Sequence, residues 1–285
     1  MRVITHEFSA DRSTEMKLVF IGDIHLGHVA CDEDRLRRTV EYVRDTSNCY
    51  WIGMGDYGDF VSRTDPRFSA GSLAKWIKIK DVSDLPGRQL DRVVSFLRPI
   101  AGKCLGLAEG NHETAIHKHY DRNIYYELRR AIEVDGKHGK SLGIDYSGWI
   151  NLVFRRAAEG SRKGGTSTIK IKVHHGFGGG KAQANFKSLS DLVSACNADI
   201  VAMGHTHKAC FLPFGYEEMS QGRVEHKTRF GVQTGTYLST TVPGEGPIYS
   251  EVGRYLPLGM ADVRVTLRPC VETKLGRIEA TLLSI

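Results

Sequence analysis

The sequence from Ile200 to His207 is IVAMGHTH. Four apolar residues, followed by glycine and by two histidines one residue apart, predict a short buried strand that ends in a tight turn. The two imidazoles then point toward one place, and imidazole is the commonest neutral ligand of metal ions. Because two histidines do not complete a metal site, other segments of the chain must add ligands to it.

Four upstream segments have the same form, in which a short apolar run ends in glycine together with aspartate, histidine or asparagine. They lead to Asp23-Ile24-His25, to Gly55-Asp56, to Gly110-Asn111-His112-Glu113 and to His174-His175-Gly176. Functional groups of open α/β sheets lie at the carboxyl ends of the strands. We therefore expect the fold to gather these five strand ends at a single site.

The order of the predicted elements is typical of an α/β protein. Residues 16–21 and 49–52 are predicted strands, and residues 32–45 between them form a predicted helix with Asp32 as its N-cap. Further predicted elements are a helix over 89–97, a strand over 103–107, one long helix ending near 132, a hairpin over 149–156 and 166–173, a helix over 186–195 and, beyond 209, short strands that suggest a second sheet.

We expect one domain over residues 1–285, because the sequence contains no repeat, low-complexity tail or linker. Residues 57–85 show no clean period, and irregular segments of this length are usually functional; they form a predicted substrate-facing insert. Within it, the alternating run from Lys75 to Lys80 has two interpretations. Trp76 is either a stacking platform for nucleic acid or part of an edge strand guarded by lysines.

The composition is that of an ordinary globular protein, with 41% hydrophobic and 25% charged residues among 285. No apolar run reaches the roughly 18 residues of a membrane span, and the polar N-terminus lacks a signal-peptide core. We therefore expect a cytoplasmic protein without membrane contact. The six cysteines are scattered without a CxxC pair and are predicted to be free thiols. A net charge of +6 fits an anionic partner but does not identify one.

The five strand ends resemble the pattern of the calcineurin-like metallophosphoesterases, which is DxH, GD, GNH[D/E], HG and GHxH in this order along the chain. Each motif alone is common, whereas all five in order, each after an apolar strand, form a specific signal. The resemblance implies an α/β fold (α+β in some schemes), a four-layer α-β-β-α sandwich of two packed mixed sheets with the active site at the strand carboxyl ends. It also implies hydrolysis of phosphoric esters.

By resemblance, seven side chains hold two divalent metal ions: Asp56 between the ions, Asp23, His25 and His207 on the first, and Asn111, His175 and His205 on the second. Such mixed nitrogen and oxygen ligands suit Mn, which we favour, and also Fe, Zn, Co or Ni. Two ions roughly 3.5–4 Å apart can clamp the attacking and the leaving oxygen of a phosphoryl displacement. The expected reaction is an in-line attack by a hydroxide that bridges the ions.

His112 has a catalytic role in the resemblance rather than that of a ligand. This histidine faces the phosphate in the family, where it orients the phosphate or protonates the leaving oxygen. Asp59 matches the position that pairs with this histidine in some members; the alternative is a solvated loop carboxylate. Asn111, His112 and Lys181 are the predicted contacts of the substrate phosphate.

Two neighbours of the predicted ligands have other interpretations. His174 precedes His175, but strand alternation turns it to the opposite face, so His175 is the predicted ligand. Glu113 is predicted to support the site by accepting hydrogen bonds.

The glycine-rich stretch 176–181 resembles a phosphate-binding loop, but it lacks the GxxxxGK[ST] spacing.

Departures from the family pattern indicate which members of the family this chain resembles. Ser/Thr protein phosphatases have arginines where this chain has Phe60 and Glu109, and purple acid phosphatases have a tyrosine where it has Asp59. What remains resembles the bacterial and phage phosphodiesterases and nuclease-like members. A diester phosphate carries one negative charge and needs fewer fixed cations than a monoester, in agreement with the missing arginines.

We therefore predict a dimetal phosphodiesterase that acts on a nucleotide or nucleic-acid diester. One alternative is a phosphomonoesterase with the same chemistry. The other belongs to a different class, a scaffold that uses this fold for protein contacts without catalysis. The completeness of the ligand set argues against the scaffold. The sequence does not predict an oligomeric state.

Overall fold

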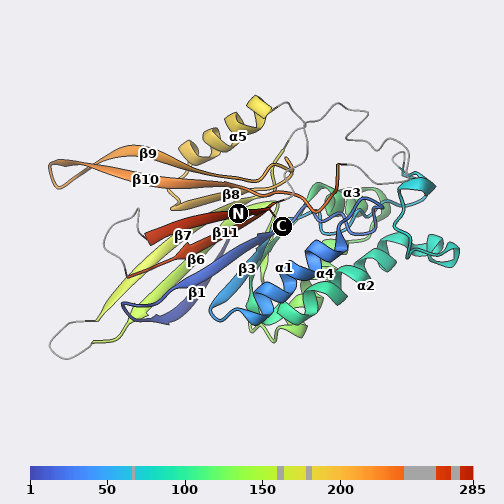
Figure 1. Cartoon of the computed structure of the whole chain (residues 1–285), viewed down its shortest axis with the longest axis horizontal. Helices are drawn as coiled ribbons and strands as arrows, with labels where there is room; N and C mark the ends of the chain where they lie inside the picture. Colours follow the sequence, from blue (N-terminus) through green and yellow to red (C-terminus); the bar gives the residue numbers. More distant parts are fainter. Residues whose placement is uncertain (66–67, 159–163, 178–181, 241–260, 271–276, 285) are drawn as a thin grey trace.

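Two mixed β-sheets pack face to face in the computed structural model, which describes residues 1–65, 68–158, 164–177, 182–240, 261–270 and 277–284 (Figure 1). The first sheet has the order β1-β6-β7-β8-β10-β9, with β1 (Arg2–Ala10), β6 (Ser147–Arg156), β7 (Gly165–His174), β8 (Ile200–Met203), β9 (Cys210–Ser220) and β10 (Arg223–Gln233). The second has the order β12-β11-β2-β3-β4-β5, with β2 (Met16–Ile21), β3 (Cys49–Gly53), β4 (Cys104–Ala108), β5 (Gly143–Asp145), β11 (Ala261–Leu267) and β12 (Ile278–Ser284).

Helices cover the outer faces of both sheets (Figure 1). The outer face of the second sheet packs against α1 (Glu33–Asp45), α2 (Leu85–Leu97) and α4 (Ile124–Asp135), whereas α5 (Ala182–Ala195) packs on the first sheet. Asp32 caps α1 as predicted, because its carboxylate accepts the Arg35 N–H at 2.8 Å. The layers are therefore α-β-β-α, and the predicted fold is confirmed.

The apolar layer between the sheets follows from strand alternation, since successive side chains point to opposite faces. Phe20 and Ile52 of the second sheet face Leu152 and Val173 of the first in one buried cluster. Trp51, adjacent to Ile52, points the other way and packs beneath the helices. Both faces of the central strands are thus buried, which explains why their sequences are continuous apolar runs.

Parallel pairing decides where polar side chains gather. In the second sheet β2, β3 and β4 run parallel, and in the first sheet β7, β8 and β10 run parallel. The carboxyl ends of parallel strands reach the same edge of a sheet. The five sequence motifs follow five of these six strands.

The strands beyond residue 209 differ from the prediction of a separate second sheet of short strands. β9 and β10 have 11 residues each and extend the first sheet as a long hairpin. β11 instead returns to pair with β2 in the second sheet. The prediction was wrong because local sequence does not encode which distant strand becomes the partner.

Three other features of the fold were missed or wrong in the sequence prediction. β1 pairs in parallel with β6, although its exposed face makes the N-terminal sequence polar. The predicted long helix is two helices, α3 (Asn111–Tyr120) and α4, separated by Asp121 at φ 52°. The Lys75–Lys80 run is a turn that leads into the 3₁₀ helix Ile79–Asp84 and contains no strand, so the edge-strand interpretation is wrong.

Within the described residues, no helix has both the length and the apolar character needed to cross a membrane. All six cysteines are free, as predicted.

Candidate metal centre

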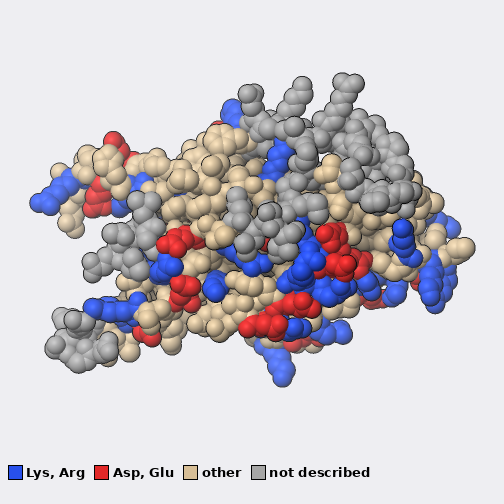
Figure 2. All heavy atoms as spheres, in the orientation of Figure 1, with Lys and Arg blue, Asp and Glu red and all other residues tan. Residues whose placement is uncertain are grey.

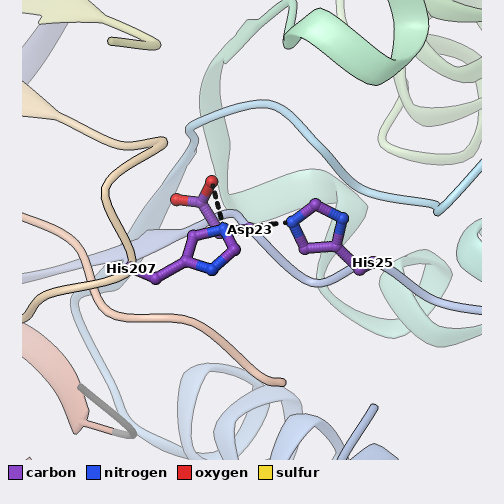
Figure 3. Close-up of side chains that lie close together, drawn as sticks. All are labelled: Asp23, His25 and His207. Carbon is purple, nitrogen blue, oxygen red and sulfur yellow. Dashed lines mark hydrogen bonds and ion pairs between the residues drawn. The ribbon is translucent and has the colours of Figure 1, made fainter. Parts of the chain in front are cut away.

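Three side chains from two strand ends converge at one point. Asp23 and His25 follow β2, and His207 follows β8 (Figure 3). The His207 Nε2 atom is 3.1 Å from His25 Nε2 and 3.6 Å from Asp23 Oδ1. Asp23 and His25 are buried, whereas His207 is partly exposed. An ion held here would have protein on one side and an accessible position on the other.

Asp56, which follows β3, lies between this group and a second one. Its Oδ2 atom is 3.9 Å from His25 Nε2 and 3.3 Å from His175 Nε2. Its other oxygen, Oδ1, accepts the main-chain N–H of His112 at 3.0 Å. The Asp56 carboxylate therefore reaches both groups while a backbone hydrogen bond fixes its orientation.

The second group contains Asn111, His175 and His205, from the ends of β4, β7 and β8. Asn111 Oδ1 is 2.9 Å from His175 Nε2 and 2.8 Å from His205 Nδ1. His175 Nδ1 donates to the Met54 carbonyl at 2.7 Å, which leaves the lone pair of Nε2 directed at the group. The structure thus brings together all seven predicted ligands in two adjacent groups that share Asp56.

The backbone is strained at this site. Five of the seven residues have φ between 48° and 68°, namely Asp23, His25, Asp56, His205 and His207. A non-glycine residue in this left-handed region costs about 1–3 kcal/mol, and such strain clusters at functional sites. The surrounding structure therefore holds these side chains in positions that their backbone does not favour.

Gly55 shows how tightly the two sheets meet beside Asp56. Its φ is +92°, and an added Cβ would lie 2.6 Å from His175 Nδ1 and 2.7 Å from the Gly110 nitrogen. Only glycine fits both the conformation and the space. The glycine of the GD motif is therefore required by packing.

Burial and charge set the protonation of the ligands. Burial lowers the pKa of His25 to about 4 and also lowers the pKa of His205, which favours the neutral imidazoles that bind metals. Burial alone would raise the pKa of Asp56, but His175 and His112 hold it well below its usual value. Conversely, burial alone would lower the pKa of His175, but Asp56 raises it to about 10. A metal cation bound beside these groups would displace the proton that the raised pKa leaves on His175.

The donor set fits two divalent cations. The groups Asp23-His25-His207 and Asp56-His175-His205 each have ligand atoms within 4.8 Å of one another. Imidazole nitrogens mixed with carboxylate oxygens suit transition metals. The buried Asp23 and Asp56 have histidines as ion-pair partners. Metal ions would supply the positive charge that buried carboxylates require.

Glu113 supports the centre through the backbone, as predicted. Its carboxylate accepts the N–H groups of Asp56 at 3.0 Å, Tyr57 at 2.8 Å and Gly110 at 2.8 Å. The side chain is fully buried. It therefore ties the loop after β3 to the loop after β4, from which Asp56 and Asn111 come.

His112 lies beside the ligands, with its ring centroid 4.7 Å from that of His25. Its Nδ1 donates to the main-chain carbonyl of Asp59 at 2.6 Å, whereas the Asp59 carboxylate is 3.8 Å from the same nitrogen. The expected Asp–His pairing is therefore made mainly through the backbone. Asp59 is buried, so the alternative of a solvated carboxylate is wrong.

Two other predicted positions have different outcomes. His174 turns away from the groups, since its Nδ1 accepts the Gly176 N–H at 2.8 Å and its ring packs against Tyr146. His175 is thus the histidine that meets the other ligands. Lys181, a predicted phosphate contact, lies outside the described residues.

The sequence analysis missed a sixth strand end at this edge. Residues after β10 hold Asp23: Thr236 Oγ1 donates to the Asp23 carbonyl at 2.7 Å, and the Tyr237 N–H donates to the same oxygen at 3.1 Å. Thr234 Oγ1 lies 3.3 Å from Asp23 Oδ2. The available signal was the run Phe230–Val232 followed by Gln-Thr-Gly-Thr, another apolar strand ending in small polar residues.

A family model of calcineurin-like phosphoesterases matches residues 16–209, which is more than half of the chain. No curated protein matches the chain.

The solved structures that match this chain include three of low sequence identity. Vps29 from Entamoeba histolytica, solved with Zn²⁺, is 12% identical with a TM-score of 0.35 and covers 94% of this chain and 98% of its own. A predicted phosphoesterase from Streptococcus pneumoniae TIGR4 is 12% identical with a TM-score of 0.33 and covers 95% and 99%. NAD nucleotidase from Haemophilus influenzae is 10% identical with a TM-score of 0.41 and covers 94% of this chain but 49% of its own.

The family match includes all seven predicted ligands, and the five motifs follow their strands in the expected order. The chain belongs to the calcineurin-like phosphoesterase family.

Proposed function

We propose that this chain is a metal-dependent phosphodiesterase that hydrolyses nucleotide or nucleic-acid type diesters, with two divalent ions, manganese favoured. The observation that carries the proposal is the carboxylate shared between two ligand groups. Asp56 Oδ2 lies within 4 Å of histidines from both groups. One anion between two cation sites is the arrangement that two-metal phosphoryl transfer requires.

The protein's own residues orient the substrate. When bound, the two cations would neutralise phosphate charge and lower the pKa of a water molecule. Asn111 and His112 are the first two residues of α3, and the positive end of a helix dipole favours a phosphate at this place. Because Asp59 holds His112 Nδ1, the opposite nitrogen Nε2 is the atom that would give a proton to the leaving oxygen.

Diester preference rests on the charges near the phosphate. Phe60 and Glu109 occupy the positions where phosphate-clamping arginines would be expected, and Phe60 is fully buried. Glu109 is partly buried, directly before Gly110 and Asn111. A carboxylate at this position disfavours a doubly charged monoester more than a singly charged diester.

Two chromogenic substrates test the preference. We expect the manganese-loaded protein to hydrolyse bis-nitrophenyl phosphate faster than mononitrophenyl phosphate, with both activities lost after chelation of the metal. Greater activity on the monoester would make the protein a phosphomonoesterase. No activity on either ester, with both ions bound, would favour a non-catalytic role. We also propose that the protein acts in the cytoplasm, where free cysteines such as these six persist.

A further inference from the structure

The insert over residues 57–85 is attached to the loop that carries His25. The Val29 N–H donates to the Ser72 carbonyl at 2.8 Å, and the Ala74 N–H donates to the Gly27 carbonyl at 2.8 Å. Two main-chain hydrogen bonds thus fix the insert against a loop of the metal centre. Any ligand between the insert and this loop would lie next to the site.

A pocket of about 310 Å³ lies between them, lined by His28, Val29, Cys31, Asp32, Glu33, Asp34, Arg37, Ala74, Lys75 and Trp76. This volume is at the lower end of the range for small-molecule sites, so it suits one ring system rather than a polymer. Its nearest link to the centre is His28, whose N–H donates to the His25 carbonyl at 3.1 Å.

Trp76 presents a rigid aromatic surface to this pocket. Its indole Nε1 donates to the Glu33 carboxylate. The guanidinium groups of Arg92 and Arg88 lie 5.2 Å and 5.8 Å from the ring centroid. These arginines are four residues apart on α2 and so share one side of that helix. Trp76 also lines the pocket, so part of the indole faces it. A ring fixed in this way loses little conformational entropy when a flat ligand stacks on it.

The charges around the pocket indicate which part of a substrate it takes. Asp32, Glu33 and Asp34 line it together with Arg37 and Lys75. Their carboxylates already accept hydrogen bonds, Asp32 from the Arg35 N–H, Glu33 from Trp76 and Arg92, and Asp34 from Arg37. Figure 2 shows the same mixture of signs over α1 and α2. Three carboxylates would repel a phosphate here but not an uncharged ring, and the lone pairs that these bonds leave over can accept from N–H groups of the ring. The phosphate therefore belongs at the metal centre and an aromatic group belongs in the pocket.

We propose that the pocket between residues 28–37 and 74–76 binds the nucleobase of a phosphodiester whose phosphate lies at the metal centre, with Trp76 as the stacking surface. This inference rests on the proposed function and adds to it the place where the base of the substrate binds. It also gives the insert a role: the insert supplies one wall of the base site. Neither a free nucleotide nor the end of a strand is favoured by these contacts, since both present the same base and phosphate.

The test compares two diesters that differ only by a nucleoside. These are thymidine 5′-(4-nitrophenyl phosphate) and ethyl 4-nitrophenyl phosphate, each with the manganese-loaded full chain. Stacking of a base on an aromatic side chain is typically worth a factor of about ten or more in affinity. We expect Trp76→Ala to raise KM about tenfold for the thymidine ester, and to change neither KM nor kcat for the ethyl ester.

Two further variants guard against misfolding. Trp76→Leu keeps apolar bulk without a stacking ring and should also lose the nucleoside preference. Trp149→Ala removes an indole from the outer face of the first sheet and should leave both esters unaffected. Equal effects of Trp76→Leu on both esters, or no effect on the thymidine ester, would overturn the base site.

Failure of the base site and failure of the proposed function give different results. If wild type hydrolyses neither ester with both ions bound, the proposed function fails. If wild type hydrolyses both with the same KM, the function stands and the base site is wrong. If the base site holds, thymidylyl-thymidine and a 12-residue oligothymidylate identify the source of the base: a larger Trp76→Leu effect on the dinucleotide indicates a free nucleotide, and a larger effect on the strand indicates a strand end.

Discussion

At the scale of single residues, Asp56 is the side chain that links the two ligand groups. Its carboxylate contacts histidines of both ligand groups, its Oδ1 accepts the His112 N–H, and its own N–H is held by Glu113. Asp56→Asn keeps the shape but removes the charge that two nearby cations would share. We expect a loss of more than about 100-fold in affinity for both ions, since even groups that only support ligands contribute 10–100-fold, and loss of turnover.

Elemental analysis of the purified Asp56→Asn protein measures this directly, together with turnover of bis-nitrophenyl phosphate. Full retention of two ions would remove Asp56 from its bridging role. Retention of one ion would assign Asp56 to a single site.

His112 should behave differently, because it lies beside the ligands without being one in our assignment. We expect His112→Ala to keep both ions and to lower kcat by about 10²–10⁴-fold, the range for a general acid. His117→Ala, five residues later on the exposed part of α3, is the matched control and should have wild-type kcat. Metal loss from His112→Ala would instead make His112 a ligand, as its closeness to His25 and Asp56 permits.

At the scale of elements, the sequence predicted which side chains come together at the centre better than it predicted the parts that hold them. The five motifs were visible because each combines an apolar run with a side chain suited to metal binding. The contribution of β10 was not visible in the same way, because threonine hydroxyls that donate to a carbonyl have no motif. Pairing of β10 with β8 brings Thr234 and Thr236 to Asp23, and pairing between distant strands is not encoded locally.

Thr236 carries a prediction at this scale. The Thr236 hydroxyl donates to the Asp23 carbonyl at 2.7 Å, and the Thr236 carbonyl accepts a hydrogen bond from the Arg35 guanidinium at 2.7 Å. Thr236→Val removes the bond to Asp23, and also the hydroxyl that accepts the Leu238 N–H at 3.1 Å, while keeping the shape of the side chain. We expect affinity for Mn²⁺ to fall about tenfold, within the range for groups that orient ligands, as measured by calorimetric titration.

Thr39→Val is the matched control. Thr39 is equally buried, and its hydroxyl contacts the Arg35 carbonyl and the Asp262 carboxylate rather than Asp23. Both variants remove a buried hydroxyl that has two hydrogen-bond partners, and should lower the free energy of unfolding of the metal-free protein by about 1–3 kcal/mol. Equal Mn²⁺ affinities in the two variants would mean that Thr236 stabilises the fold without orienting Asp23 for metal binding.

At the scale of the whole molecule, the chain beyond the family match completes the centre. The match ends at residue 209, yet Asp262 of β11 forms a buried ion pair with Arg35 at 3.0 Å. Arg35 also stacks on Tyr237, whose N–H holds Asp23. Long-range tertiary contacts of this kind cannot be deduced from motif spacing, which explains why the sequence predicted the layers but not how β9–β12 were distributed between them.

The two sheets are also joined by a polar contact, and it carries the last prediction. His6 of β1, in the first sheet, has its Nε2 2.7 Å from the carbonyl of Leu105 in β4, in the second. Burial lowers the pKa of His6 to about 4 from an ordinary value of 6.5. Because the unfolded chain takes up this proton first, the contribution of neutral His6 is complete above pH 6.5 and is lost as the pH falls toward 4.

We expect His6→Gln, which can keep a donor at the Nε2 position but cannot titrate, to remove that part of the pH dependence. His6 is only partly buried, so solvent screens part of the effect of its lowered pKa. The two proteins should therefore differ by about 1–2 kcal/mol in the free energy of unfolding that they lose on acidification. Urea unfolding of both metal-free proteins at pH 7.5 and at pH 4.5 gives the comparison, since the other histidines titrate alike in both and cancel. Wild type should lose more stability than the variant over this interval; equal losses would mean that His6 is protonated without opening the contact between the sheets.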